Sequence, residues 1–64
     1  MTPKEIIKIL EGRGFLLKRI NGSHHVFYHP ILKKITVVPL HKKDLPIGTL
    51  HAILKQAGID KKDI

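Results

Sequence analysis

The dipeptide Asn21-Gly22 lies between two short runs of β-forming residues, and this arrangement constrains the fold more than any other feature. The runs are "FLLKRI" at residues 15–20 and "HHVFYH" at residues 24–29. Asn and Gly tolerate the positive φ angles of a type I′ turn, so the pattern predicts a β-hairpin. A third run, "KITVVP" at residues 34–39, is rich in β-branched residues and follows the connecting turn "PILKK". The sequence therefore predicts three antiparallel strands.

The segment before the strands is predicted to be helical. Thr2 and Glu5 have the spacing of a capping box, and Pro3 suits the first helical position. Apolar residues then recur at helical spacing until the glycines of "GRG" at residues 12–14 stop the run. We therefore predict a first helix from Pro3 to Gly12.

A second helix is predicted after the basic loop "LHKKDLP". Apolar residues from Ile47 to Ala57 recur at helical spacing, and Gly58 suits the left-handed conformation that ends a helix. In the tail "GIDKKDI", Asp60 and Asp63 either cap one last turn or the segment frays.

With 64 residues, the chain is long enough for a single domain, residues 1–64, with one thin core. The predicted element order is α-β-β-β-α. Each helix has one apolar stripe to bury, so we expect an α+β fold in which both helices cover one face of a three-stranded antiparallel sheet. The other face is left open. The double-stranded-RNA-binding fold has the same element order, although order alone does not establish RNA binding.

Charge is the main functional signal in the composition. Twelve Lys and Arg against five Asp and Glu leave a net charge of +7, which favours a polyanionic partner. A generally soluble basic surface would give the same value. One Tyr and two Phe are too few for the stacking platform of single-strand binders. The chain has no cysteine and no apolar run of membrane-spanning length, so we expect a cytoplasmic protein that does not bind membranes.

Alternation along the second strand decides which histidines face outward. His24 and Tyr28 point to one face, whereas His25 and Phe27 point to the other. Phe27 is the natural core anchor, so His25 is turned toward the helices and His24 toward the open face. On this prediction Val26 is exposed together with His24 and Tyr28.

Four sequence motifs follow one another along the chain: "GRGF", "NGSHHVFYHP", "ITVVPLH" and "DLPIGTLHAILKQAGI". With these motifs the chain resembles the HicA family, also called YcfA-like proteins, the toxins of HicA–HicB toxin–antitoxin pairs. The resemblance implies a metal-independent endoribonuclease that cuts messenger RNA and blocks growth until a HicB-like antitoxin covers it. It also implies that the catalytic histidine is His24 and that the preceding turn glycine is Gly22.

Metal-independent RNA cleavage uses the 2′-hydroxyl as an internal nucleophile and needs a base, an acid and cations. Free histidine has a pKa of about 6.5, so an imidazole supplies either protonation state near neutral pH. We predict one proton-transfer role for His24. The second role is open between His41, in the loop after the third strand, and water. No cofactor is needed for this chemistry.

Further residues are predicted to bind the RNA. One pair of cations flanks the hairpin, and a second pair lies in the loop of His41. Together they form the densest basic grouping outside the tail. Ser23 belongs to the turn, and Tyr28 either stacks a base or packs within the sheet. The predicted substrate-binding residues are Lys18, Arg19, Gly22, Ser23, His25, Tyr28, His41, Lys42 and Lys43.

Two other functions fit the same residues. A non-catalytic RNA-binding module would use His24 to contact a phosphate or a 2′-hydroxyl, and a protein-docking surface would not bind RNA at all. A metal site is not expected, because there is no cysteine and His24 and His25 lie on opposite strand faces. A HicB-like partner is expected to offer carboxylates to Lys18, Arg19 and His24.

Overall fold

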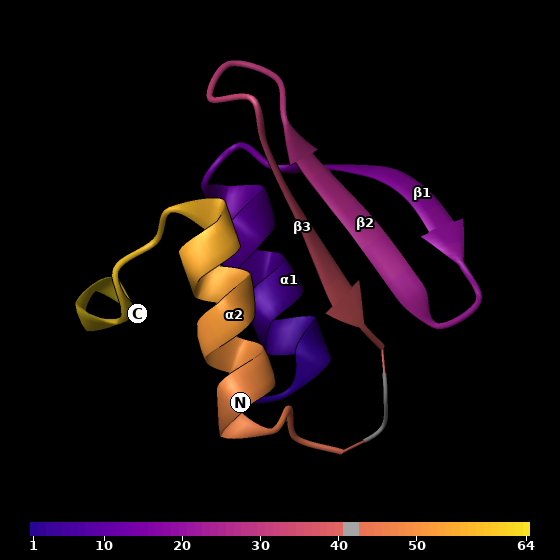
Figure 1. The fold of residues 1–64 in the computed structure, drawn as a ribbon, viewed down its shortest axis with the longest axis vertical. Coiled ribbons are helices and arrows are strands. Elements are labelled where there is room, and N and C mark those ends of the chain that lie inside the picture. The colour runs from indigo at the N-terminus through magenta and orange to yellow at the C-terminus, as the bar shows by residue number, and fades with distance from the viewer. Residues whose placement is uncertain (41–42) are drawn as a thin grey trace.

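The computed structural model describes residues 1–40 and 43–64, and its elements follow the predicted order (Figure 1). They are α1 (Pro3–Gly12), β1 (Leu16–Asn21), β2 (His24–His29), β3 (Lys34–Pro39), α2 (Ile47–Ala57) and the 3₁₀ turn η1 (Lys61–Asp63). The strands form one antiparallel sheet in the order β1-β2-β3. The predicted α+β fold is confirmed, and so are the predicted bounds of both helices.

The predicted capping box starts α1. The Thr2 hydroxyl accepts a hydrogen bond from the Glu5 backbone N–H at 3.3 Å, and Glu5 Oε1 accepts one from the Thr2 N–H at 2.8 Å. The second of these bonds, together with the bond from the Thr2 hydroxyl, holds the pKa of the Glu5 carboxyl below its ordinary value. The capping box therefore satisfies two backbone donors at the start of α1, those of Thr2 and Glu5.

The hairpin turn lies one residue later than predicted. Asn21 pairs with His24, which leaves Gly22 and Ser23 as the two turn residues. Gly22 has a φ of 62°, whereas Ser23 is not among the described residues with positive φ. Positive φ at the first central residue alone is the signature of a type II′ turn, for which Gly-Ser is a favoured pair. The predicted type I′ turn at Asn21-Gly22 is therefore wrong.

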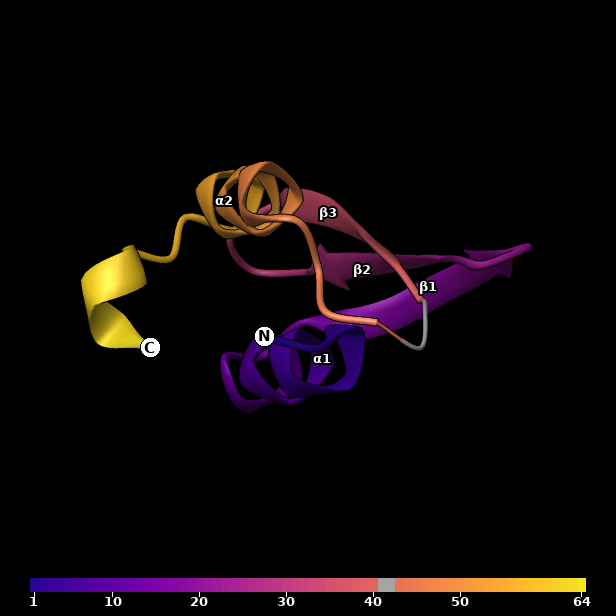
Figure 2. The same ribbon diagram turned by 90° about the horizontal axis from the view of Figure 1, so that it is seen from below.

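The core lies between the helices and one face of the sheet. Phe27, Thr36 and Val38 project from this face, and Phe27 is only 1% exposed. The buried Thr36 hydroxyl donates to Gln56 Oε1 at 2.9 Å, which offsets the cost of burying it. Figure 2 shows α1 and α2 on the same side of the sheet. The core residues are Ile6, Leu10, Phe15, Phe27, Val38, Leu45, Ile53, Leu54, Ala57 and Ile59.

The C-terminal segment continues in an ordered turn. Gly58 has a φ of 70° and ends α2 in the predicted left-handed conformation. Asp60 then accepts a hydrogen bond from the Lys62 N–H at 3.0 Å and caps η1. Arg13, after α1, donates from Nη2 to the carbonyl oxygen of Asp63 at 3.2 Å. Of the predicted alternatives, the capped turn is the one formed.

Within the described part of the chain, no helix has the length and apolar character needed to cross a membrane.

Candidate functional site

The face of the sheet away from the helices, called the open face below, carries three rows of paired residues. Each row runs from β1 through β2 to β3. The rows are Asn21–His24–Pro39, Arg19–Val26–Val37 and Leu16–Tyr28–Ile35. Directly paired residues share a face, and Phe27 is buried on the opposite one. The predicted placement of His24 and Tyr28 on the open face is therefore confirmed.

Val26 is the exception on this face. It was predicted to be exposed with His24, but only 5% of its surface is accessible. Val26 lies on the central strand between Arg19 and Val37, and its short side chain is flanked on both sides, on one of them by the much longer Arg19. It is outside the core cluster and yet unavailable to a ligand.

A β-bulge brings two cations to the open face. Leu17 pairs with Phe27 and Arg19 pairs with Val26, so Lys18 between them has no partner on β2. The Lys18 ammonium lies 5.4 Å from the centre of the Tyr28 ring, on the open face. Simple alternation would have turned Lys18 and Arg19 to opposite faces. The bulge instead places both charges beside the row of Tyr28 and the row of Val26.

His24 lies at the end of the sheet next to the hairpin turn. Its side chain is exposed, and it pairs with Asn21 on one side and Pro39 on the other. Arg19 is its diagonal neighbour, at a typical separation of about 7–8 Å, within reach of a long side chain. A single phosphate over this corner of the sheet can therefore contact both His24 and Arg19.

The other turn residues do not present side chains with His24. His25 belongs to the opposite face, is half-buried and donates from Nδ1 to the carbonyl oxygen of Ser23 at 3.3 Å. The same carbonyl accepts the Leu40 N–H at 2.7 Å, which ties the segment after β3 to the bend. Gly22 has no side-chain neighbour within 4 Å of the position of a Cβ. The structure thus places His24, Lys18, Arg19 and Tyr28 on one face and leaves His25 out.

The basic loop after β3 leaves the sheet at the end where His24 lies, because Pro39 pairs with His24. Lys43 is exposed in this loop. His41 and Lys42, which were predicted to bind substrate, lie outside the described residues. Lys43 is therefore the one predicted contact from this loop that the structure describes, and no contact joins it to His24 among the hydrogen bonds and ion pairs of the described residues.

His29 has a structural position that the sequence did not reveal. Its Nε2 donates to the carbonyl oxygen of Arg13 at 3.1 Å, and its Nδ1 accepts the Leu32 N–H at 3.0 Å. The ring also meets Phe15 edge-on, with ring centres 5.1 Å apart. In the sequence His29 was only part of the motif "NGSHHVFYHP", and its contacts with Arg13 and Phe15 could not be seen there, because these residues precede the hairpin.

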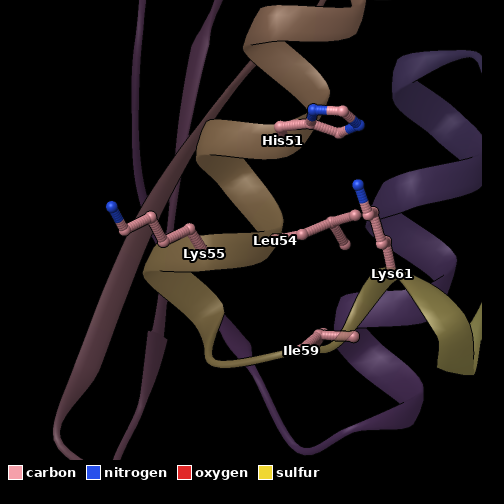
Figure 3. A pocket seen from close by; sticks show the side chains of 5 residues that line it. All are labelled: His51, Leu54, Lys55, Ile59 and Lys61. Atoms are coloured by element: carbon pink, nitrogen blue, oxygen red, sulfur yellow. The ribbon is translucent and has the colours of Figure 1, made fainter.

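A separate hollow lies between α2 and η1, on the helix side of the molecule (Figure 3). Its lining residues are His51, Leu54, Lys55, Ile59 and Lys61. The His51 ring and the Lys61 ammonium approach the same space above Leu54, whereas Lys55 points away from them. None of the predicted site residues that the structure describes lines it. Across the described residues, His, Asp and Glu side chains do not gather in a group of three that could hold a metal ion.

The structure defines a small basic α+β domain whose open sheet face carries an exposed histidine and two cations. The sequence matches the family model for the HicA toxin of bacterial toxin–antitoxin systems over residues 3–59, and the chain belongs to this family. Membership implies an antitoxin partner. None of the curated proteins matches the sequence.

Proposed function

We propose that this protein is a cytoplasmic toxin that cuts messenger RNA without a metal ion and uses His24 as a general acid or base. The observation that carries the proposal is the bulge at Lys18, which adds two cations to the face of the only exposed imidazole on the described part of the sheet. Membership of the HicA toxin family supports it. A small basic domain with an accessible imidazole on its open face can supply one of the two proton transfers and the cations that such a reaction needs.

The reaction proposed is an internal transesterification. The 2′-oxygen attacks the adjacent phosphorus, the bond from phosphorus to the 5′-oxygen breaks, and the products carry a 2′,3′-cyclic phosphate and a 5′-hydroxyl. One proton leaves the 2′-hydroxyl and one joins the 5′-oxygen, and His24 performs one of these transfers. Arg19, the diagonal neighbour of His24, stabilises the negative charge that develops on the phosphoryl oxygens, whereas Lys18, beside Tyr28, binds the strand further from the cut. The partner in the second transfer is His41 or water.

RNA binding is proposed to use the same face. Lys18 and Arg19 neutralise phosphates, Tyr28 contacts a base, and Gly22 and Ser23 let the strand approach the bend closely. Lys43, which is exposed in the loop after β3, is proposed to bind a further phosphate, and His41 and Lys42, which lie outside the described residues, are proposed as additional RNA contacts. His25 is the weakest member of this set, because its ring faces the helices and is held by Ser23.

The antitoxin is proposed to be a HicB-like protein that competes with RNA for the open face. Carboxylates offered to Lys18, Arg19 and His24 would satisfy the same charges that the phosphates satisfy. Charge reversal at Lys18 and Arg19 is then expected to weaken the complex strongly. A complex that forms equally well with both lysine and arginine replaced by glutamate would overturn this part of the proposal.

The decisive experiment incubates the purified protein with a long RNA in the presence of EDTA. Wild-type protein is expected to give fragments ending in cyclic phosphate, and His24→Ala to give at least about a hundredfold less cleavage, since a positioned acid or base contributes ~100- to 10,000-fold. His51→Ala is the matched control, because His51 is exposed on α2 at the far side of the molecule. Full cleavage by His24→Ala would contradict the proposal.

A non-catalytic RNA-binding module is the alternative, and one observation favours it. In the described part of the chain, the three rows of the open face contain one imidazole and no carboxylate, so neither a second imidazole nor a carboxylate is there to share the proton transfers. The same experiment separates the two functions. A mobility shift of the RNA without new fragments would identify the module.

A further inference from the structure

We propose that the row Leu16–Tyr28–Ile35 is a subsite that stacks one unpaired RNA base, at the opposite end of the open face from His24. The inference rests on RNA being the ligand of this face, and it adds the kind of RNA and the place where a base is held. The row would make unpaired RNA the substrate, and the base that it holds would belong to a nucleotide other than the one that is cut.

The row has the composition of a base-binding surface. Leu16 and Ile35 are the direct partners of Tyr28 on the two neighbouring strands, and they are 60% and 46% exposed. Tyr28 itself is half-buried between them. An aromatic ring lying between two aliphatic side chains on an uncovered sheet offers a flat apolar area that water solvates poorly. Sheets that bind single-stranded RNA use aromatic side chains in this way.

Lys18 gives the row its selectivity for a nucleotide over an apolar partner. Its ammonium lies 5.4 Å from the centre of the Tyr28 ring, close to the place where a base would lie. Lys18 is exposed, so this contact is weak and the side chain is free to move. A base that takes the ring face releases the ammonium to pair with the phosphate of the same nucleotide. An aliphatic segment of a protein would instead leave that charge without a partner.

The distance along β2 places this subsite away from the cut. Tyr28 and His24 are separated by four residues of one strand, or about 13 Å at the usual rise of a β-strand. The row of Arg19 lies between them, within reach of the phosphate at His24. The stacked base therefore belongs to a nucleotide near the scissile phosphate rather than to the nucleotide that supplies the 2′-oxygen.

The row also predicts a preference for unpaired RNA. In a duplex the base faces are stacked on one another, and only groove edges and the sugar-phosphate backbone are available to a protein. Leu16 and Ile35 carry no group that hydrogen-bonds a phosphate or a 2′-hydroxyl. Duplex RNA would consequently lose the contacts of the whole row, although Lys18 and Arg19 could still attract it.

The test uses His24→Ala protein, which is expected to bind RNA without cutting it, and a short labelled single-stranded RNA. Replacing Tyr28 by Leu in this background is expected to weaken binding by about 5- to 150-fold, the range for losing one base–aromatic stack. Tyr28→Phe keeps the aromatic ring and is expected to bind as tightly as the protein with Tyr28. Ile20→Ala is the matched control, because Ile20 is 57% exposed but points to the other face of β1.

A second readout does not depend on substitution of the ring. Tyr28 is the only tyrosine and the chain has no tryptophan, so its fluorescence reports on this row alone. Single-stranded RNA is expected to quench it, and duplex RNA of the same length to quench it far less.

A third measurement places one abasic nucleotide at successive positions of the RNA. At one of these positions it should weaken binding to the protein that has Tyr28, and at none of them should it weaken binding to the Tyr28→Leu protein.

The outcomes distinguish this inference from the proposed function. If Tyr28→Leu and the abasic series leave binding unchanged while His24 is still needed for cleavage, the subsite is wrong and the nuclease stands. If the protein binds no RNA at all, both are wrong. If Tyr28→Leu weakens only the complex with the antitoxin, the row is a protein contact and the subsite is overturned.

Discussion

Lys18 and Arg19 are consecutive residues of one β-strand, and both side chains lie on the open face of the sheet. Arg19 pairs with Val26, and the Lys18 ammonium lies over the Tyr28 ring, because a bulge at Lys18 interrupts the alternation of β1. The positive charge of this face is therefore concentrated between His24 at one end and Tyr28 at the other. The remaining lysines of the helices do not contribute to it.

The two charges should appear in the salt dependence of RNA binding. If each neutralises one phosphate, replacing Lys18 and Arg19 by Gln should reduce the slope of log affinity against log salt by roughly 1.4, at about 0.7 per phosphate on single strands. Lys4→Gln with Lys8→Gln is the matched control, since both lysines are exposed on α1. Equal slopes for the two double variants would show that the open face does not hold the phosphates.

Expression of the wild-type chain in bacterial cells is expected to arrest growth, because cleavage of messenger RNA stops translation. His24→Ala should relieve the arrest at equal protein levels, and His25→Ala, whose ring faces the helices, should relieve it far less. Growth curves with immunoblots of the expressed protein measure both. Arrest that persists unchanged with His24→Ala would mean that the toxic effect does not use this imidazole.

His29 is expected to be a stability residue. His29→Ala removes the bonds to the Arg13 carbonyl and the Leu32 N–H as well as the contact with Phe15, and we expect the free energy of unfolding to fall by about 1–3 kcal/mol. His51→Ala should change it by less than about 0.5 kcal/mol, as for most surface sites. Urea denaturation followed by circular dichroism gives both values. A loss no larger than that of the control would refute the role.

Gly12 and Gly14 are expected to respond oppositely to alanine. Gly14 has a φ of 94°, and a Cβ there would lie 2.8 Å from His29 Nε2, so Gly14→Ala should destabilise the fold by more than about 1 kcal/mol. Gly12 is the last residue of α1 with open space around it, so Gly12→Ala should gain about 0.5 kcal/mol. Thermal unfolding of the two variants measures the difference. Equal stabilities would contradict the close approach of His29.

The capping box should make the stability of the fold fall in acid. The hydrogen bond from the Thr2 backbone lowers the pKa of Glu5 in the folded state, so the folded state binds this proton less readily than the unfolded state. The contribution is complete above the ordinary pKa of Glu and is lost as the pH falls through the lowered value. Glu5→Gln should flatten this part of the curve of unfolding free energy against pH, whereas Glu11→Gln, at the end of α1, should not.

Local sequence signals predicted the helices and the open-face position of His24. Thr2, Pro3 and Glu5 define one helix start, Gly58 defines one helix end, and Phe27 has to be buried, which fixes the direction of every side chain on β2. These features act within one turn or one strand, so they are visible in the sequence.

Features that depend on pairing between strands were not predictable in the same way. Asn21-Gly22 and Gly22-Ser23 are both acceptable turns, and the choice between them follows from the pairing of Leu17 with Phe27 in the folded sheet. The bulge at Lys18 follows from the same pairing, since one residue of β1 has to be left over. The burial of Val26 and the bonds of His29 likewise need partners that lie far away in the sequence.

The bulge in β1 also affects how copies of this domain meet. All six residues of β1 are exposed, and the outer side of this strand has no neighbour within the described chain. A regular strand in that position would be a template on which a second molecule could extend the sheet and begin a fibre. The extra residue at Lys18 breaks the even spacing of backbone donors and acceptors and adds a charge. Both effects protect the β1 edge against pairing with a second copy of the chain.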